Sequence, residues 1–372
     1  VVDNVGAKPP RPGALSAHGP RTERGRRTAR SRRKAHDRAP GNARADDGDS
    51  PRAVLPLSSP TESAVMPATA IVSGVSVTNV RDLSEEAGLP VDTINGYYNA
   101  RATVSAEVFE ETIARYREGS IAARKIATAL DVVYDEASGQ TIDIFGGGEE
   151  PRAAFVFIHG GYWRALSKNE SAFMAEMLAR HGIATVAVDY QLAPEATLTE
   201  IVRQVRAAMA FLHREGRRYG IDPERLYVGG SSAGGHLTGA VIAGGWHADF
   251  GVPEDLVKGA LPVSGLFHLA PIARSFVSEW LTLSDADVAA LSPAENLPRT
   301  GCPIVVAYAA NEAAGFGRQS EAFHKAWQAA GFPSKLMEIA DRHHFDVVLD
   351  LQSDRTELGQ ALLDLIAGRQ AD

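Results

Sequence analysis

Gly230-Ser231-Ser232-Ala233-Gly234 follows directly on the apolar run Arg225-Leu226-Tyr227-Val228-Gly229 and leads into small residues. A short strand that breaks into a Gly-x-Ser-x-Gly turn and continues as a helix is the nucleophile-elbow pattern, which exposes a serine oxygen on a sharp bend. Glycines are needed on both sides of the serine, because the bend brings backbone atoms too close for larger side chains. Ser232, rather than Ser231, is therefore the candidate nucleophile.

Strands and helices alternate on both sides of this turn. Short apolar segments rich in β-branched residues predict strands at 153–158, 184–189, 225–228, 257–263, 304–308 and 334–339. Amphipathic segments between them predict helices near 169–181, 198–219, 233–244, 318–330 and 345–367. This alternation predicts an α/β fold, in which a mostly parallel central sheet carries helices on both faces.

Two further regions frame this alternation. Helices are expected near 84–99 and 105–130, followed by a strand pair at 131–134 and 140–145. The stretch 267–297 breaks the alternation and is expected to form an inserted helical cap.

Bulk composition indicates a globular protein. The 372 residues are 44% hydrophobic and 23% charged, which is ordinary for such a protein. No apolar run is long enough to cross a bilayer, so no membrane association is expected. The single cysteine, Cys302, excludes an intrachain disulfide and fits a reducing compartment such as the cytoplasm.

The front of the chain differs from the rest in charge. Residues 1–52 carry 13 Lys and Arg against 6 Asp and Glu, which leaves a net charge of −15 for the remainder. With few bulky apolar residues, residues 1–65 are expected to be a disordered basic tail, ahead of one domain at 66–372. A solvated tail, or sequence upstream of a natural start at Met66, explains the basic residues better than nucleic-acid binding. The stretch lacks the apolar region of a signal peptide.

Acyl transfer through a serine also needs oxyanion donors, an acid and a base, and each has a place in the chain. The strand at 153–158 runs into His159-Gly160-Gly161-Tyr162-Trp163. Glycines let the backbone approach a substrate closely, so the N–H groups of Gly161 and Tyr162, together with that of Ala233, are the candidate oxyanion donors.

The acid and the base are expected after the last two strands. Glu312 follows the strand at 304–308 and is the candidate acid, while Asp341 is the alternative in the loop after the final strand. That loop holds adjacent His343 and His344, and the helix expected after them favours His344 as the base. An imidazole that titrates near neutral pH can transfer protons in both directions.

The remaining candidates have structural or binding roles. His159 and His236 are expected to support the oxyanion turn and the elbow helix. Trp163 and Phe316, with Tyr162 and Trp280, are candidates for an aromatic substrate pocket. No metal or cofactor is expected, because the sequence has neither a metal-binding spacing of His and Cys nor a phosphate-binding glycine loop.

The motifs together resemble a known family. His159-Gly160-Gly161-Tyr162-Trp163, Asp189-Tyr190-Gln191-Leu192-Ala193-Pro194-Glu195 and the elbow resemble hormone-sensitive-lipase-like α/β-hydrolases. With Gly317-Arg318-Gln319-Ser320, His343-His344-Phe345-Asp346 and Tyr97-Tyr98-Asn99-Ala100-Arg101, they look most like kynurenine formamidase (arylformamidase) and related bacterial esterases, over roughly residues 90–367.

The resemblance implies an α/β-hydrolase fold and a Ser232–His344–Glu312 triad. Two positions depart from the family: Glu312 stands where Asp is usual, and Gly315 stands where an acidic residue commonly precedes Phe316.

The expected function is that of a serine hydrolase. It would cleave a small aryl formamide or carboxylic ester through an acyl-enzyme, with a general short-chain carboxylesterase as the alternative. A ligand-binding protein on a hydrolase fold is a weaker alternative, because such proteins usually lose the base. Small-molecule esters or amides are the expected partners, nucleic acid is not, and a homodimer is compatible with the sequence.

Overall fold

The computed structural model describes residues 83–369, and the basic tail expected at 1–65 lies outside them. One sheet has the strand order β1-β2-β4-β3-β5-β6-β7-β8. β1 pairs antiparallel with β2, and β2 with β4, whereas all later pairs are parallel. The predicted α/β-hydrolase sheet is thereby confirmed. The strands are β1 (Ala127–Asp135), β2 (Gln140–Phe145), β3 (Arg152–Ile158), β4 (Ala184–Val188), β5 (Ile221–Ser231), β6 (Val257–Val263), β7 (Ile304–Asn311) and β8 (Ser334–His343).

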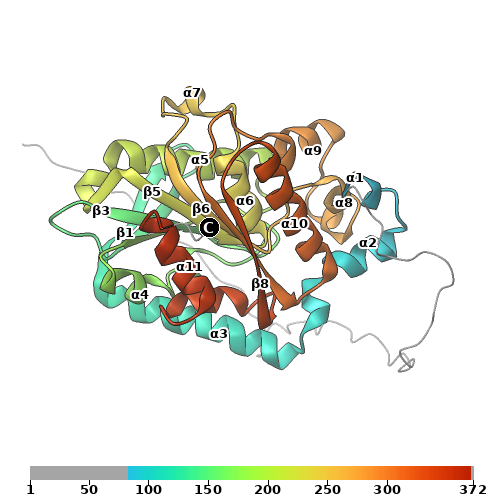
Figure 1. Ribbon diagram of the computed structural model, residues 1–372, viewed down its shortest axis with the longest axis horizontal. Helices are drawn as coiled ribbons and strands as arrows, with labels where there is room; N and C mark the ends of the chain where they lie inside the picture. The colour runs from blue at the N-terminus through green and yellow to red at the C-terminus, as the bar shows by residue number, and fades with distance from the viewer. Residues whose placement is uncertain (1–82, 370–372) are drawn as a thin grey trace, which may run out of the picture. The chain divides into compact units, whose positions relative to one another are not determined.

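Helices cover both faces of this sheet (Figure 1). Phe155 and Phe157 of β3 pack in a core with α3, α4 and α11, while Val156 and Ile158 pack on the other face with α5, α6 and α10. Because neighbouring strand residues point to opposite faces, a strand buried on both sides is apolar throughout. The helices are α1 (Leu83–Glu86), α2 (Val91–Tyr98), α3 (Ala106–Ala123), α4 (Ala175–Arg180), α5 (Leu198–Glu215), α6 (Ala233–Ile242), α7 (His247–Phe250), α8 (Ala270–Ala273), α9 (Asp285–Leu291), α10 (Ala314–Ala329) and α11 (Glu357–Ile366).

Several element boundaries differ from the sequence expectation. The helix predicted at 345–367 is two elements, the 3-10 helix η8 (Val347–Gln352) and α11, because the Thr356 side chain accepts from the Gly359 N–H and caps a new helix. The helix predicted near 169–181 likewise divides into η4 (Lys168–Glu170) and α4. β1 starts at Ala127, inside the stretch predicted as helix, because pairing with β2 overrides the helical propensity of its alanines.

The segment expected as a cap contains four short helices, namely α8, η6 (Phe276–Glu279), α9 and η7 (Pro293–Glu295). The side-chain oxygen of Gln319, on α10, accepts from the N–H groups of Phe267 and His268 at 2.8 Å each. Asn95 of α2 accepts from the Phe276 N–H at 2.7 Å. Figure 1 shows α1, α2 and α8 together at one end of the described domain. The cap segment is therefore tied to α10 and to α2.

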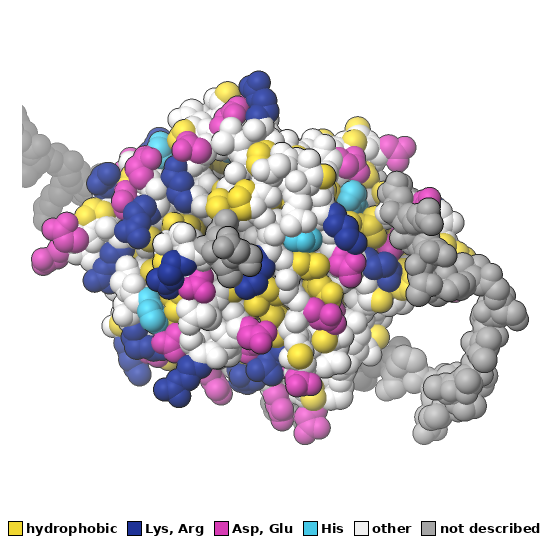
Figure 2. Space-filling model, viewed as in Figure 1, with side chains coloured by type: hydrophobic (Ala, Val, Ile, Leu, Met, Phe, Trp, Pro, Cys, Tyr) yellow, Lys and Arg dark blue, Asp and Glu magenta, His cyan; other side chains and the backbone are white. Residues whose placement is uncertain are grey.

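Charged side chains of both signs are interspersed on the face drawn in Figure 2. Of the helices within residues 83–369, none combines the length and the apolar character that a membrane span requires.

Candidate active site

Ser232 stands at a sharp bend between β5 and α6. Its φ is +59° and its ψ −118°, a conformation that ordinary residues adopt only under constraint. A Cβ on Gly230 would lie 2.5 Å from the carbonyl oxygen of Ile158, and one on Gly234 would lie 2.0 Å from it. Both flanking glycines are therefore required by the close packing of this bend on β3.

Glu312 and His344 form a buried pair beside this bend. Oε2 of Glu312 lies 2.6 Å from Nδ1 of His344, and each side chain is 2% exposed. Oε1 of Glu312 accepts from the Ser264 hydroxyl at 3.1 Å and from the Ala309 N–H at 3.2 Å. A carboxylate held by two donors and facing Nδ1 orients the ring, which leaves Nε2 as the nitrogen available to other groups.

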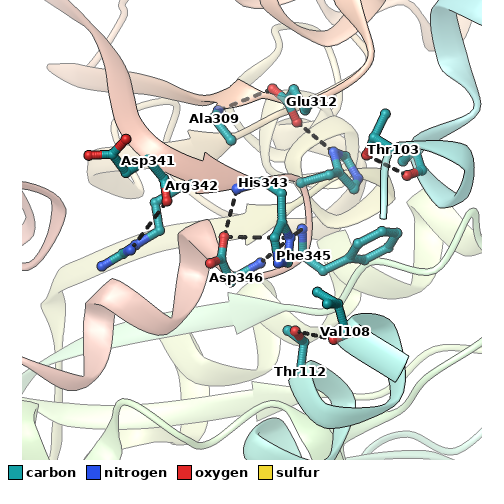
Figure 3. A network of polar contacts seen from close by, with 12 residues as sticks. Thr103, Val108, Thr112, Ala309, Glu312, Asp341, Arg342, His343, Phe345 and Asp346 are labelled. Atoms are coloured by element: carbon teal, nitrogen blue, oxygen red, sulfur yellow. Dashed lines mark hydrogen bonds and ion pairs between the residues drawn. The ribbon is translucent and has the colours of Figure 1, made fainter. Parts of the chain in front are cut away.

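The two alternatives considered for the acid and the base lie apart from this pair. Nδ1 of His343 accepts from the N–H groups of Phe345 and Asp346 at 3.2 Å each, and the Asp346 carboxylate accepts from the His343 N–H. Burial lowers the pKa of His343, an effect that Asp346 opposes. Asp341 is exposed, and Figure 3 shows it pointing away from Glu312, on the far side of the strand.

The loop after β3 has an unusual backbone. Gly161, Tyr162 and Trp163 have φ of +94°, +49° and +58°. The Gly161 carbonyl accepts from the N–H groups of Arg164 and Ala165, which closes the turn. Within residues 83–369, the N–H groups of Gly161, Tyr162 and Ala233 have no hydrogen-bond acceptor. Three backbone donors are thus left free at the places where oxyanion donors are expected.

A cavity of about 480 Å³ joins these parts. Ser232, His344, Gly161 and Tyr162 all line it. Most of the remaining wall is apolar, and its aromatic members are Phe109, Tyr116, Phe157, Tyr162, Phe173, Phe276, Trp280 and Phe345.

Trp163 and Phe316, which were expected to bind substrate, do not line this cavity. Both side chains are fully buried. The Trp163 ring meets His236 edge-on, with 5.2 Å between centroids, and the Phe316 ring lies 4.2 Å from that of His344. Phe316 therefore packs behind the imidazole, and Trp163 fills the core beneath the turn.

Some wall residues were not found from the sequence. Phe109, Ile113 and Tyr116 face the cavity from α3, and the Tyr116 hydroxyl donates to the Phe345 carbonyl. Their spacing of i, i+4 and i+7 marks one helix face, which is a detectable signal, but it does not say what that face covers. Ser264, which supports Glu312, carries no sequence signal of this kind.

The other two histidines near the site make structural contacts. Nε2 of His236 donates to the Leu291 carbonyl at 2.9 Å, and burial lowers its pKa to about 4. Nδ1 of His159 donates to the Gly160 carbonyl at 3.0 Å, and its ring stacks on Tyr190 at 4.1 Å. The part of the chain that the structure describes contains no group of three or more His, Cys, Asp or Glu side chains able to hold a metal ion.

The comparisons with known proteins agree with this architecture. The family model BD-FAE matches residues 142–249. Among solved structures, a thioesterase candidate from Silicibacter sp. TM1040 has a TM-score of 0.62 at 25% identity, covering 73% of this chain and 97% of its own. A hyperthermophilic esterase from Pyrobaculum calidifontis has a TM-score of 0.57 at 16% identity, covering 78% and 97%, and shows a shared fold.

Two curated relatives are more similar in sequence. Kynurenine formamidase from Salmo salar is 32% identical over 273 residues, which span 70% of this chain and 90% of that protein. Kynurenine formamidase from Danio rerio is 32% identical over 268 residues, which span 70% and 89%. Identity at this level over nearly the full length of both relatives means that the chain belongs to the kynurenine formamidase family of α/β-hydrolases.

Proposed function

We propose that this hydrolase cleaves a small aryl formamide through an acyl-enzyme on Ser232. The observation that carries the proposal is the buried hydrogen bond between Glu312 and His344, because His344 lines the same cavity as Ser232. A base that is oriented by a carboxylate and lines one cavity with a serine on a strained bend fits the arrangement that activates a hydroxyl nucleophile.

In this mechanism Nε2 of His344 takes the Ser232 proton as the hydroxyl oxygen attacks the substrate carbonyl carbon. The carbonyl oxygen gains negative charge, which the N–H groups of Gly161, Tyr162 and Ala233 stabilise. Glu312 stabilises the imidazolium without taking its proton. His344 then gives the proton to the leaving amine or alcohol, and a water molecule, activated by the same ring, releases the acid.

The wall of the cavity supports an aryl group in the substrate. Many of the side chains that line the cavity are aromatic. Offset or edge-on contacts between aromatic rings favour binding by more than the burial of apolar surface alone. The sequence likeness to two kynurenine formamidases supports a formamide over an ester. A general short-chain carboxylesterase is the alternative that the same triad would serve.

The test compares kcat/KM for N-formylkynurenine, p-nitrophenyl acetate and p-nitrophenyl butyrate. A higher kcat/KM for the formamide supports the proposal, and a clear preference for the butyrate would replace it with the carboxylesterase. Ser232→Ala should abolish turnover of all three substrates with an unchanged circular dichroism spectrum, and Ser231→Ala is the matched control. Turnover retained by Ser232→Ala would move the nucleophile elsewhere.

A further inference from the structure

Tyr162, which carries one of the proposed oxyanion donors, is held by residues from outside the sheet. Its hydroxyl donates to the carbonyl of Tyr98, the last residue of α2. Its own carbonyl oxygen accepts from the indole Nε1 of Trp280, at 3.1 Å. Its ring packs edge-on against Phe276 and Trp280, with centroids 5.5 and 6.3 Å away. The side chain and the backbone of Tyr162 are therefore both anchored.

The indole contact falls on the strained part of this loop. Tyr162 and Trp163 are consecutive non-glycine residues with positive φ, which costs free energy and persists only where surrounding contacts enforce it. The Tyr162 carbonyl belongs to the peptide that joins these two residues. A hydrogen bond to that oxygen opposes rotation of this peptide, and so opposes relaxation of the backbone that carries the Tyr162 N–H.

Trp280 is itself fixed in place. The Arg164 guanidinium lies over its ring, 4.1 Å from the centroid. Trp280 follows η6, whose first residue, Phe276, is bonded through its N–H to Asn95 of α2. The Tyr98 carbonyl of α2 also accepts from the Tyr162 hydroxyl. Hydrogen bonds therefore connect α2 to the cap segment, the cap segment to the oxyanion loop, and the oxyanion loop to α2.

We infer that Trp280 is a positioning residue, whose indole N–H holds the 162–163 peptide so that the oxyanion donors keep their places. This role rests on the proposed function. Trp280 also lines the cavity, so it could serve merely as a wall for the substrate. A wall contact changes ground-state binding and therefore KM, whereas a misplaced oxyanion donor lowers kcat.

The test uses Trp280→Phe, which keeps an aromatic ring in the cavity and removes the N–H. We expect kcat for p-nitrophenyl acetate to fall about tenfold, less than the roughly 10²- to 10³-fold loss when an oxyanion donor is removed outright, and KM to change by less than about twofold. The Ki of an aryl trifluoromethyl ketone, which forms a tetrahedral oxyanion on the serine, should rise by the same factor as kcat/KM falls.

Trp327→Phe is the matched control. Its indole N–H also donates to a backbone carbonyl at 3.1 Å, that of Cys302, away from the cavity. We expect this variant to keep the wild-type kcat and Ki, even where it lowers the melting temperature. A raised KM with unchanged kcat in Trp280→Phe would make Trp280 a wall residue and overturn the inference.

Hydrogen exchange gives a readout that does not need turnover. The amides of residues 160–165 should exchange faster in Trp280→Phe and at the wild-type rate in Trp327→Phe. Unchanged exchange would contradict the positioning role. A wild-type protein that hydrolyses neither formamide nor ester would instead contradict the proposed function, whatever the exchange data show.

Discussion

The carboxylate of Glu312 lies 2.6 Å from Nδ1 of His344, and both side chains are almost fully buried. The family resemblance led us to expect Asp at this position, where this chain has the longer Glu. Here the longer side chain is braced by Ser264 and by the Ala309 N–H, which fix one carboxylate oxygen while the other faces the imidazole. The pair therefore depends on the length of Glu as well as on its charge.

We predict that Glu312→Gln lowers kcat by about 10³- to 10⁴-fold, because an amide cannot stabilise the imidazolium and favours the wrong ring tautomer. Glu312→Asp should also lower kcat, since the shorter carboxylate cannot keep the Ser264 and His344 contacts together. Steady-state kinetics on an aryl ester check both. Asp341→Asn is the control and should retain wild-type kcat; a large loss there would reassign the acid.

Replacement of each adjacent histidine separates their roles. His344→Asn should abolish detectable turnover, because it removes the proposed base. His343→Asn should keep kcat within about threefold of wild type, since it removes no group that lines the cavity and Asn can still accept from the backbone N–H groups of the loop. A reversed order of effects would make His343 the base.

Gly161→Ala should lower kcat by about 10²-fold or more, because a Cβ there would meet the Ala165 carbonyl oxygen at 2.3 Å and φ is +94°. Gly182→Ala isolates the backbone effect, since φ is +71° and no heavy atom lies within 4 Å of the added Cβ. That control should cost about 1 kcal/mol of stability without changing kcat. If Gly161→Ala and Gly182→Ala had the same kcat, the loop after β3 would have no role in the proposed mechanism.

The buried His236 makes stability depend on pH. Burial lowers its pKa to about 4 from an ordinary value of 6.5, so in acid the unfolded chain takes up a proton that the folded chain refuses. This contribution is absent above pH 6.5 and destabilises increasingly as the pH falls toward 4. Between pH 7.5 and 4.5, the free energy of unfolding should therefore fall by about 2 kcal/mol less in His236→Gln than in wild type, as measured by urea unfolding. If unfolding free energy depended on pH in the same way in both proteins, the lowered pKa of His236 would be contradicted.

The sheet could be predicted from the sequence because its strands are apolar on both faces and are separated by amphipathic helices. The loops after β3, β5, β7 and β8 could be located for the same reason, since parallel strands place their carboxyl ends on one edge. The motif order then pointed to Ser232, Glu312 and His344, and the structure brings Glu312 and His344 into contact and places His344 and Ser232 on one cavity.

Contacts between residues far apart in the sequence could not be predicted from periodicity and motif order. Periodicity shows that α3 has an apolar face, but only the tertiary structure shows that Phe109 and Tyr116 cover the cavity. Trp163 was expected in the cavity wall, but an aromatic residue next to a glycine turn can equally belong to the core, where the structure places it. The bracing of Glu312 by Ser264 joins residues 48 positions apart, and no local pattern records it.

Part of the cavity wall comes from η2 (Ala100–Thr103) and α3, which precede every strand of the sheet. This part of the wall lies on a different stretch of polypeptide from the groups proposed to break the bond. Substitutions confined to residues 99–116 can alter which molecules enter while the reacting groups on the strand ends stay as they are. Sequence differences among relatives at residues 99–116 would then indicate a changed substrate rather than a changed reaction.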